Sequence, residues 1–175
     1  MNAAMDNPVT GKAAQEVESV LGYRFQNSEH LVLALTHSSF AHEKSGTYLA
    51  CNERLEFLGD AVLGLIITRH LYDTYPDLPE GKLSVMKSRL VSGIMLGKMA
   101  KALNLGKYLL LGRGEEKLGG RIRKSMLART FEAIVAAIFL DGGLEGAREF
   151  VLNLFQRELN DIQQGMQQYD YKSQL

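Results

Sequence analysis

Three carboxylates in one short apolar stretch are the residues best placed to do chemistry. Glu53, Glu56 and Asp60 fall at positions i, i+3 and i+7 of the segment Asn52-Glu-Arg-Leu-Glu-Phe-Leu-Gly-Asp60. On a helix this spacing puts all three on one face. Like charges among apolar side chains are costly unless a cation lies between them. The spacing therefore predicts a divalent metal site, for which carboxylate oxygens favour Mg²⁺, with Mn²⁺ as a substitute. The simpler alternative is a solvated acidic face.

Two more acidic residues have structural explanations that the spacing alone favours. Glu132 follows Phe131 in a second apolar segment and needs a partner there. Arg129, three residues earlier, shares its helical face and could form an intrahelical salt bridge with it. Glu80 stands at an expected helix start, where a carboxylate complements the helix dipole.

His37, Phe57 and Cys51 are each open to a simple interpretation. The imidazole in Thr36-His-Ser-Ser-Phe40 could bond phosphates or backbone groups equally well. Phe57 interrupts the acidic face, and its default interpretation is core packing. Cys51 is the only cysteine, which excludes an internal disulfide and fits a reducing cytoplasm.

The composition of the 175-residue chain suits one domain with a sizeable core, since 46% of the residues are hydrophobic. No apolar run reaches about 18 residues, so we expect no membrane span. Lys plus Arg and Asp plus Glu number 20 each, and zero net charge normally argues against a nucleic-acid partner. Residues 113–129, however, carry six basic side chains against two acidic ones. A basic strip beside a metal cleft suits a phosphodiester substrate.

The pattern predicts an all-α fold, because only three prolines occur and β-branched alternation is scarce. We expect Gly22 to end the first helix, Ser28 to cap the second and Asp141-Gly142-Gly143 to end the second strongly apolar one. Polar and glycine-rich loops are expected at 42–49 and 106–120. The expected helices cover residues 13–21, 28–35, 51–75, 82–92, 94–103, 125–140 and 144–163.

Residues 17–159 resemble the ribonuclease III family of double-stranded RNA endonucleases. The resemblance rests on the Asn52–Asp60 segment and on four further motifs: Leu35-Thr-His-Ser-Ser39, Pro79-Glu-Gly-Lys-Leu-Ser84, Gly114-Glu-Glu-Lys-Leu-Gly-Gly-Arg121, and Phe131-Glu-Ala through Leu140-Asp-Gly-Gly143. It implies the all-α ribonuclease III endonuclease-domain fold and a symmetric homodimer. Two active sites then lie in one valley, and each cuts one RNA strand.

The resemblance also implies a domain organisation. Residues 1–12 are expected to be an N-terminal tail and residues 13–162 the nuclease domain. The tail Tyr169-Asp-Tyr-Lys-Ser-Gln-Leu175 resembles the opening of a double-stranded RNA-binding domain. Residues 163–175 are therefore expected to be a linker and the start of that domain.

Site roles follow from the same resemblance, residue by residue. Glu56, Asp60 and Glu132 correspond to catalytic metal ligands, and Glu53 and Glu80 to supporting acidic groups of the catalytic site. Phe57 corresponds to an apolar knob that enters a pocket on the partner subunit. The residues expected to contact RNA are Asn52, His37, Lys117, Arg121 and Lys124.

One position departs from the family pattern: Arg129 stands where the family has Asp. An arginine cannot deprotonate to become a ligand, but its guanidinium could bridge Glu132 and Asp60 in the space of a cation. We therefore expect a cytoplasmic, divalent-metal-dependent endonuclease that cleaves double-stranded RNA to 5′-phosphate and 3′-hydroxyl ends, with doubtful metal occupancy and impaired activity. The alternative is an inactive RNA-binding or scaffold module. An engineered substitution, a weakly active natural member and a natural inactive relative all fit Arg129.

Overall fold

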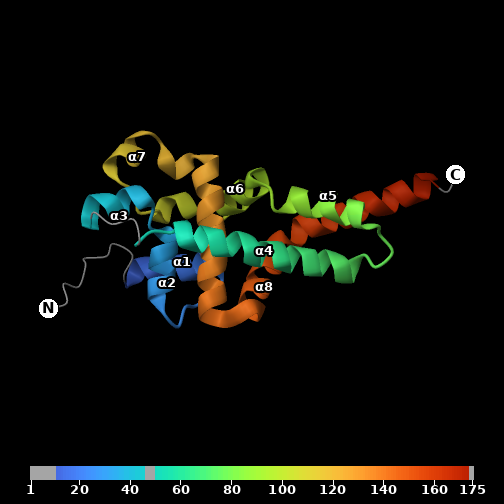
Figure 1. Ribbon diagram of the computed structural model, residues 1–175, viewed down its shortest axis with the longest axis horizontal. Helices are drawn as coiled ribbons and strands as arrows, with labels where there is room; N and C mark the ends of the chain where they lie inside the picture. The colour runs from blue at the N-terminus through green and yellow to red at the C-terminus, as the bar shows by residue number, and fades with distance from the viewer. Residues whose placement is uncertain (1–10, 46–49, 174–175) are drawn as a thin grey trace.

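The computed structural model describes residues 11–45 and 50–173, and the regular structure in these ranges is helical (Figure 1). The predicted all-α fold is confirmed. One isolated parallel bridge joins Thr36 and Leu110. The elements are α1 (Lys12–Leu21), α2 (Ser28–Leu35), α3 (Ser38–Ser45), α4 (Glu53–Thr74), α5 (Glu80–Leu90), α6 (Gly93–Ala102), η1 (Leu105–Tyr108), α7 (Arg113–Lys117), η2 (Gly120–Ile122) and α8 (Lys124–Ser173).

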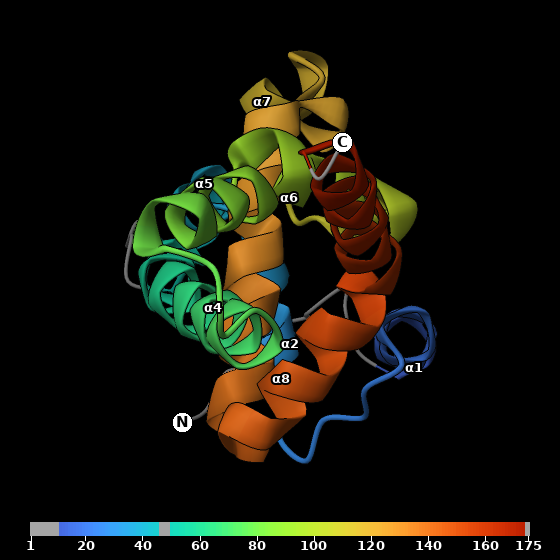
Figure 2. The same ribbon diagram turned by 90° about the vertical axis from the view of Figure 1, so that its right-hand side faces the viewer.

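The first half of α8 forms the centre of the molecule. It packs against α2, α4 and α6, and Figures 1 and 2 show it crossing between these elements. Residues 133–138 are wholly inaccessible to solvent. A helix that is apolar all round needs neighbours on every side, which is why this segment lies at the core.

A kink at Gly143 divides α8 into two halves. Gly143 has φ 71° and ψ −173°, a conformation that glycine adopts at little cost. Asp141 anchors the turn between α1 and α2 here, because its carboxylate accepts hydrogen bonds from the Tyr23 hydroxyl and the Gln26 amide, both at 2.9 Å. Across the kink, the ring of Phe131 stacks on that of Phe150 at 5.9 Å. The predicted break at residues 141–143 therefore falls where expected.

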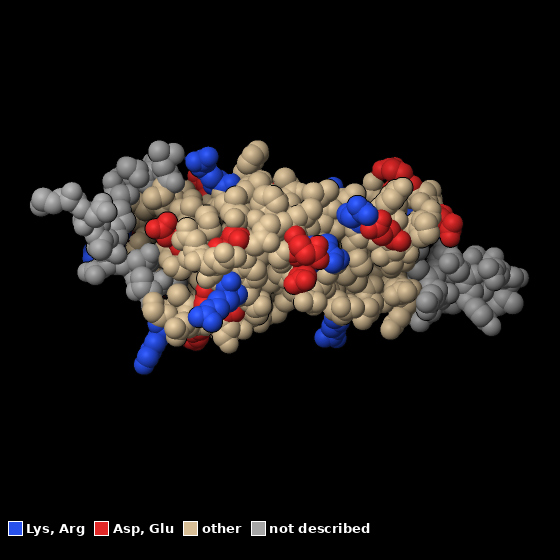
Figure 3. Space-filling view, turned by 90° about the horizontal axis from the view of Figure 1, so that it is seen from below, with Lys and Arg blue, Asp and Glu red and all other residues tan. Residues whose placement is uncertain are grey.

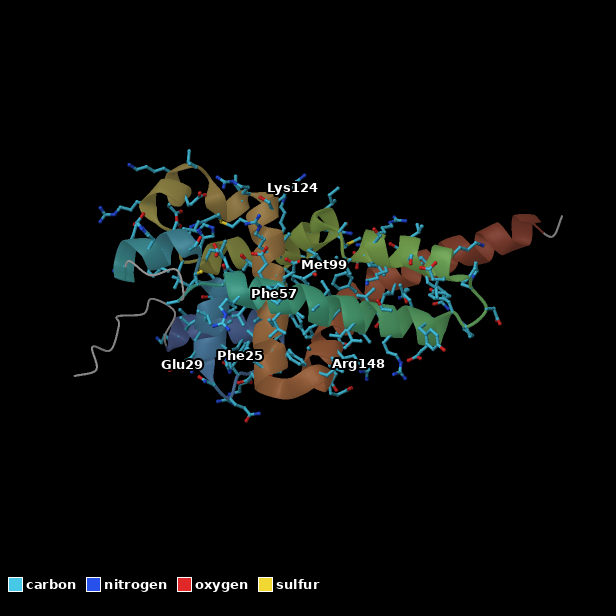
Figure 4. All side chains as sticks on the ribbon, in the orientation of Figure 1. Phe25, Glu29, Phe57, Met99, Lys124 and Arg148 are labelled. Carbon is cyan, nitrogen blue, oxygen red and sulfur yellow. The ribbon has the colours of Figure 1, made fainter. Side chains whose placement is uncertain are left out.

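Helix α4 is buried on one face only. Leu55, Val62 and Ile66 are buried, whereas Phe57 is 83% and Leu65 55% exposed. The default interpretation of Phe57 as a core residue is wrong, because α8 and α5 cover other faces of α4 and leave this one open (Figure 4).

Other boundaries differ in detail. The expected loop at 42–49 is helical through Ser45, as part of α3, and its residues 46–49 lie outside the described ranges. The N-cap of α2 is Asn27 rather than Ser28, since the Asn27 side chain accepts the Glu29 amide at 3.0 Å. Helix α8 continues to Ser173, past the expected end at 163.

The glycine-rich segment 106–120 is less irregular than expected, because α7 and parts of η1 and η2 lie within it. Within the described residues, no helix is long and apolar enough to cross a membrane.

Candidate active site

Helices α4 and α8 cross at a point where Gly59 of α4 contacts Glu132 of α8. A β-carbon built on Gly59 would lie 1.8 Å from the backbone oxygen of Glu132, so only glycine fits at this crossing. The next residue after Gly59 is Asp60. The close approach therefore brings an acidic residue of α4 beside an acidic residue of α8.

The electrostatics show that three carboxylates share this region. Burial, together with the charges of Asp60 and Glu56 and opposed by Arg129, raises the pKa of Glu132 to about 7. Burial also raises the pKa of Glu56, with Arg129 lowering it and Glu53 raising it. Residues 72 positions apart in sequence thus meet at one crossing. The predicted apposition of Asp60 and Glu132 is realised in the fold.

Arg129 pairs across the crossing rather than along its own helix. Its Nε atom lies 3.5 Å from Oε1 of Glu56. The expected intrahelical salt bridge to Glu132 and the expected bridge between Glu132 and Asp60 are both absent from the described residues. The reason is geometric: Glu56 on α4 faces the Arg129 guanidinium, and one helix turn separates Glu56 from Asp60.

As arranged, these residues do not fit a metal ion. Within the described ranges, no three His, Cys, Asp or Glu side chains are positioned to hold one. Hard carboxylate oxygens are present in the right number, but a guanidinium already neutralises Glu56. Burial is the main cause of the raised pKa of Glu132, and a divalent cation would relieve the repulsion by Asp60 and Glu56 that adds to it.

A pocket of about 260 Å³ opens beside the crossing. Acidic, basic and imidazole groups meet in it, and its charged or titratable lining residues are His37, Glu53, Glu56, Glu115, Arg123 and Arg129. Burial lowers the pKa of His37, so the imidazole stays neutral more readily than in water. Sequence reasoning missed Glu115, which pairs with Arg123 at 3.0 Å. A glutamate in a helix as short as α7 gives no periodic signal that would mark it.

Two residues expected to contact RNA have structural partners. The buried Asn52 donates from its amide to the Ala34 carbonyl at 3.2 Å and thereby ties the start of α4 to α2. Arg121 donates to the carbonyls of Gly106 and Leu109 at 2.9 and 2.8 Å, and its Nε donates to Glu116. These bonds hold η1 and η2 together.

The remaining expected site residues lie apart from the carboxylates. Lys117 and Lys124 are exposed at the end of α7 and the start of α8 (Figure 4). Glu80 begins α5, near the far end of α4, and accepts a hydrogen bond from Ser84 at 2.5 Å. Within one chain, Glu80 is therefore not part of the cluster, and its position matches the helix-start explanation.

The comparisons with known proteins agree with this geometry. The family described as ribonuclease-III-like matches residues 27–159, a range that contains α4 and the first half of α8. The chain belongs to the ribonuclease III family. Ribonuclease 3 of Desulforamulus reducens is 49% identical over 162 residues, which cover 93% of this chain and 66% of that protein. Ribonuclease 3 of Geobacter metallireducens is 45% identical, over 97% of this chain and 70% of that protein.

Solved ribonuclease III structures share the fold. The nuclease domain of ribonuclease III from Campylobacter jejuni superposes with a TM-score of 0.76 at 39% identity, covering 85% of this chain and 97% of that domain. Dicer from Pichia stipitis, at 24% identity and a TM-score of 0.58, shares the fold alone. The chain spans about two thirds of the length of the curated ribonuclease 3 relatives. It therefore corresponds to the nuclease domain of a ribonuclease III.

Proposed function

We propose that this chain is an endonuclease domain that cleaves double-stranded RNA to 5′-phosphate and 3′-hydroxyl ends and that Arg129 impairs its activity. The observation that carries the proposal is the crossing at which burial and the charges of Asp60 and Glu56 raise the pKa of Glu132 while Arg129 pairs with Glu56. Negative charge gathered from two helices is what a phosphodiester nuclease of this family needs, and Arg129 removes part of it.

The carboxylates supply the site's charge and geometry. In this reaction class, divalent Mg²⁺ or Mn²⁺ activates a water molecule and stabilises the departing oxygen. With the Arg129 guanidinium against Glu56, the described side chains are not arranged to hold that cation; without this ion pair, Glu56, Asp60 and Glu132 would be its ligands, with Glu53 supporting them from the same face of α4. The guanidinium of Arg129 adds a fixed positive charge where the family has a carboxylate. A cation near Glu56 must therefore compete with a charge that the chain cannot release.

The basic segment 117–124 is the surface we assign to RNA phosphates. Its exposed members include Lys117 and Lys124, whose contacts would position the duplex without reading its sequence. The face shown in Figure 3, seen from below and thus opposite to α7, carries scattered acidic and basic side chains over a largely uncharged surface. With zero net charge, the chain should bind RNA weakly and with a steep dependence on salt.

A symmetric homodimer would complete the enzyme, with each subunit cutting one strand. The exposed Phe57 on α4 is the apolar knob that we expect to enter the partner subunit. Exposing such a large aromatic side chain to water is unfavourable unless a partner covers it. The C. jejuni nuclease domain has a region involved in dimer formation, and it is 40% identical to this chain.

Two assignments concern the surroundings of the domain. Cys51 is the single cysteine of the sequence and is buried, which is consistent with a cytoplasmic location. Residues 163–175 are assigned as a linker and the start of a double-stranded RNA-binding domain. Helix α8 extends through Ser173, so this linker would be helical where it leaves the nuclease domain.

The Arg129–Glu56 ion pair also favours a second candidate function, an RNA-binding module that cuts nothing. Incubating long duplex RNA and Mg²⁺ or Mn²⁺ with this chain, with Arg129→Asp and with Arg129→Asp/Glu132→Gln separates the two. Cleavage by Arg129→Asp that disappears in the double variant supports a disabled nuclease. Binding without cleavage by all three supports the module. Rapid cleavage by the unaltered chain would contradict the role given to Arg129.

A further inference from the structure

The imidazole of His37 is held in one orientation by Ser39. The backbone amide of Ser39 donates to Nδ1 of His37 at 3.2 Å, and the Ser39 hydroxyl lies 2.8 Å from the same nitrogen. That hydroxyl oxygen also accepts the Gly112 amide at 2.9 Å. The ring is thus tied both to the start of α3 and to the segment that leads into α7.

These bonds determine which ring nitrogen carries the proton. The Ser39 amide can only donate, so Nδ1 must accept. Because the Ser39 oxygen accepts from Gly112, its own hydrogen is available for Nδ1. A neutral imidazole with an unprotonated Nδ1 carries its proton on Nε2. A doubly protonated ring would instead direct its Nδ1 hydrogen at the Ser39 amide hydrogen.

The Nε2–H group is available to donate a hydrogen bond to a ligand. Among the described residues, Nδ1 is the ring nitrogen of His37 that makes hydrogen bonds, while the ring lines the pocket beside the α4–α8 crossing. Arg123 and Arg129 line the same pocket, together with Glu53, Glu56 and Glu115, and Arg123 belongs to the basic segment 117–124. A fixed neutral donor here suits an acceptor oxygen of a nucleic-acid backbone.

We propose that His37 donates a hydrogen bond from Nε2 to a backbone oxygen of the bound RNA, a phosphate oxygen or a ribose 2′-hydroxyl, and that Ser39 is the positioning residue that fixes the tautomer. The proposal rests on the proposed function, because it takes double-stranded RNA as the ligand. It adds a contact that does not depend on a cation in the cluster.

The test is RNA affinity, measured by fluorescence anisotropy with a labelled duplex and the full 175-residue chain in EDTA, so that nothing is cleaved. Losing one such hydrogen bond should weaken binding about 3- to 10-fold in His37→Ala. His37→Gln retains an N–H donor and should stay within about twofold of the unaltered chain. His42→Ala, on helix α3 that begins directly after His37, is the matched control and should bind normally.

A second measurement does not require a stable variant. Long-range ¹H–¹⁵N spectra of the unaltered chain report the tautomer directly, and we expect an Nε2–H ring whose Nε2 signal shifts when duplex RNA is added. Ser39→Ala should mix the two tautomers.

A duplex with 2′-deoxyribose separates the two acceptors. If His37→Ala still weakens binding to that duplex, the acceptor is the phosphate; if the weakening disappears, the acceptor is the 2′-hydroxyl.

The outcomes are distinct. Equal RNA affinity of His37→Ala and the unaltered chain, or an Nδ1–H tautomer, overturns the His37 proposal while the proposed function stands. An unaltered chain that binds no duplex RNA overturns both. Weaker binding by His37→Ala with normal binding by His42→Ala supports the assignment.

Discussion

Gly59 of α4 lies against the backbone carbonyl of Glu132 of α8, with room for a hydrogen and not for a methyl group. A β-carbon at Gly59 would sit 1.8 Å from the Glu132 oxygen and 2.5 Å from its carbonyl carbon. Backbone atoms cannot move aside as a flexible side chain can. The separation of the two helices, and hence of Asp60 and Glu132, depends on this contact.

Gly59→Ala should therefore destabilise the domain. Forcing a methyl group into a packed crossing costs about 1–3 kcal/mol or more, so the thermal midpoint should fall by several degrees. Gly64→Ala is the matched control on the same helix, because its β-carbon would meet only the end of the Lys87 side chain at 3.8 Å. That change should be neutral or stabilising by up to about 1 kcal/mol. Equal thermal midpoints for the two variants would contradict the crossing.

The raised pKa of Glu132 predicts a pH-dependent stability. Its pKa is about 7 in the folded chain against an ordinary value of 4.5, so the folded state binds the proton more tightly. The resulting stabilisation is fully present below about pH 4.5 and is lost as the pH rises through about 7. In metal-free buffer, Glu132→Gln should match the unaltered chain near pH 4.5 and exceed it above pH 7. The gain should be on the order of 1 kcal/mol, since solvent screens this half-exposed side chain.

Thermal unfolding between pH 4.5 and 8 measures this effect. Glu149→Gln is the control, because Glu149 is an exposed glutamate of the same helix. Its midpoint should follow that of the unaltered chain at every pH. A Glu132→Gln profile parallel to that of the unaltered chain would show that Glu132 does not titrate near neutrality.

Metal removal should affect the unaltered chain very little. Arg129 already supplies a positive charge to Glu56 at 3.5 Å, so the unfolding temperature should be nearly the same with and without EDTA. In Arg129→Asp that charge is replaced by a negative one, and Mg²⁺ should raise the midpoint through binding to the folded state. A large drop caused by EDTA in the unaltered chain would contradict the role of Arg129 as a substitute for a cation.

Phe57→Ala should weaken self-association without unfolding the subunit. The side chain is 83% exposed in the single chain, so its loss removes few contacts within the subunit and should change stability by less than about 0.5 kcal/mol. Sedimentation velocity over a concentration series gives the dimer dissociation constant. Ile94→Ala, at an 82% exposed residue of α6, is the control. If both variants dimerise like the unaltered chain, Phe57 is not an interface residue.

The sequence predicted the features that depend on the spacing of apolar residues and on glycine residues that kink or end a helix. Helices α4 and the first half of α8 are long apolar runs, and the glycine pair at 142–143 marks the kink, so all three were predictable. Helix α3 was missed because its sequence is polar and shows no clear apolar face. The N-cap of α2 differs from the predicted one by one residue, because Asn27 rather than Ser28 provides the hydrogen-bond acceptor.

The sequence could indicate which residues belong to the site, but it could not indicate which of them contact one another. Carboxylate spacing and the family resemblance pointed to Glu56, Asp60 and Glu132. That Arg129 pairs with Glu56 rather than with Glu132 depends on how two helices cross, which no spacing along one helix can indicate. The structural bonds of Asn52 and Arg121 likewise depend on loops packed from distant parts of the chain.

The most direct measurement is the affinity for Mn²⁺, followed by electron paramagnetic resonance, in the unaltered chain, Arg129→Asp and Arg129→Asp/Glu132→Gln. If side chains of α4 and α8 form one site that Arg129 blocks, Arg129→Asp should bind Mn²⁺ at least about tenfold more tightly than the unaltered chain, a difference of about 1.4 kcal/mol. The double variant should lose that gain. Equal Mn²⁺ affinity in all three proteins would contradict the account.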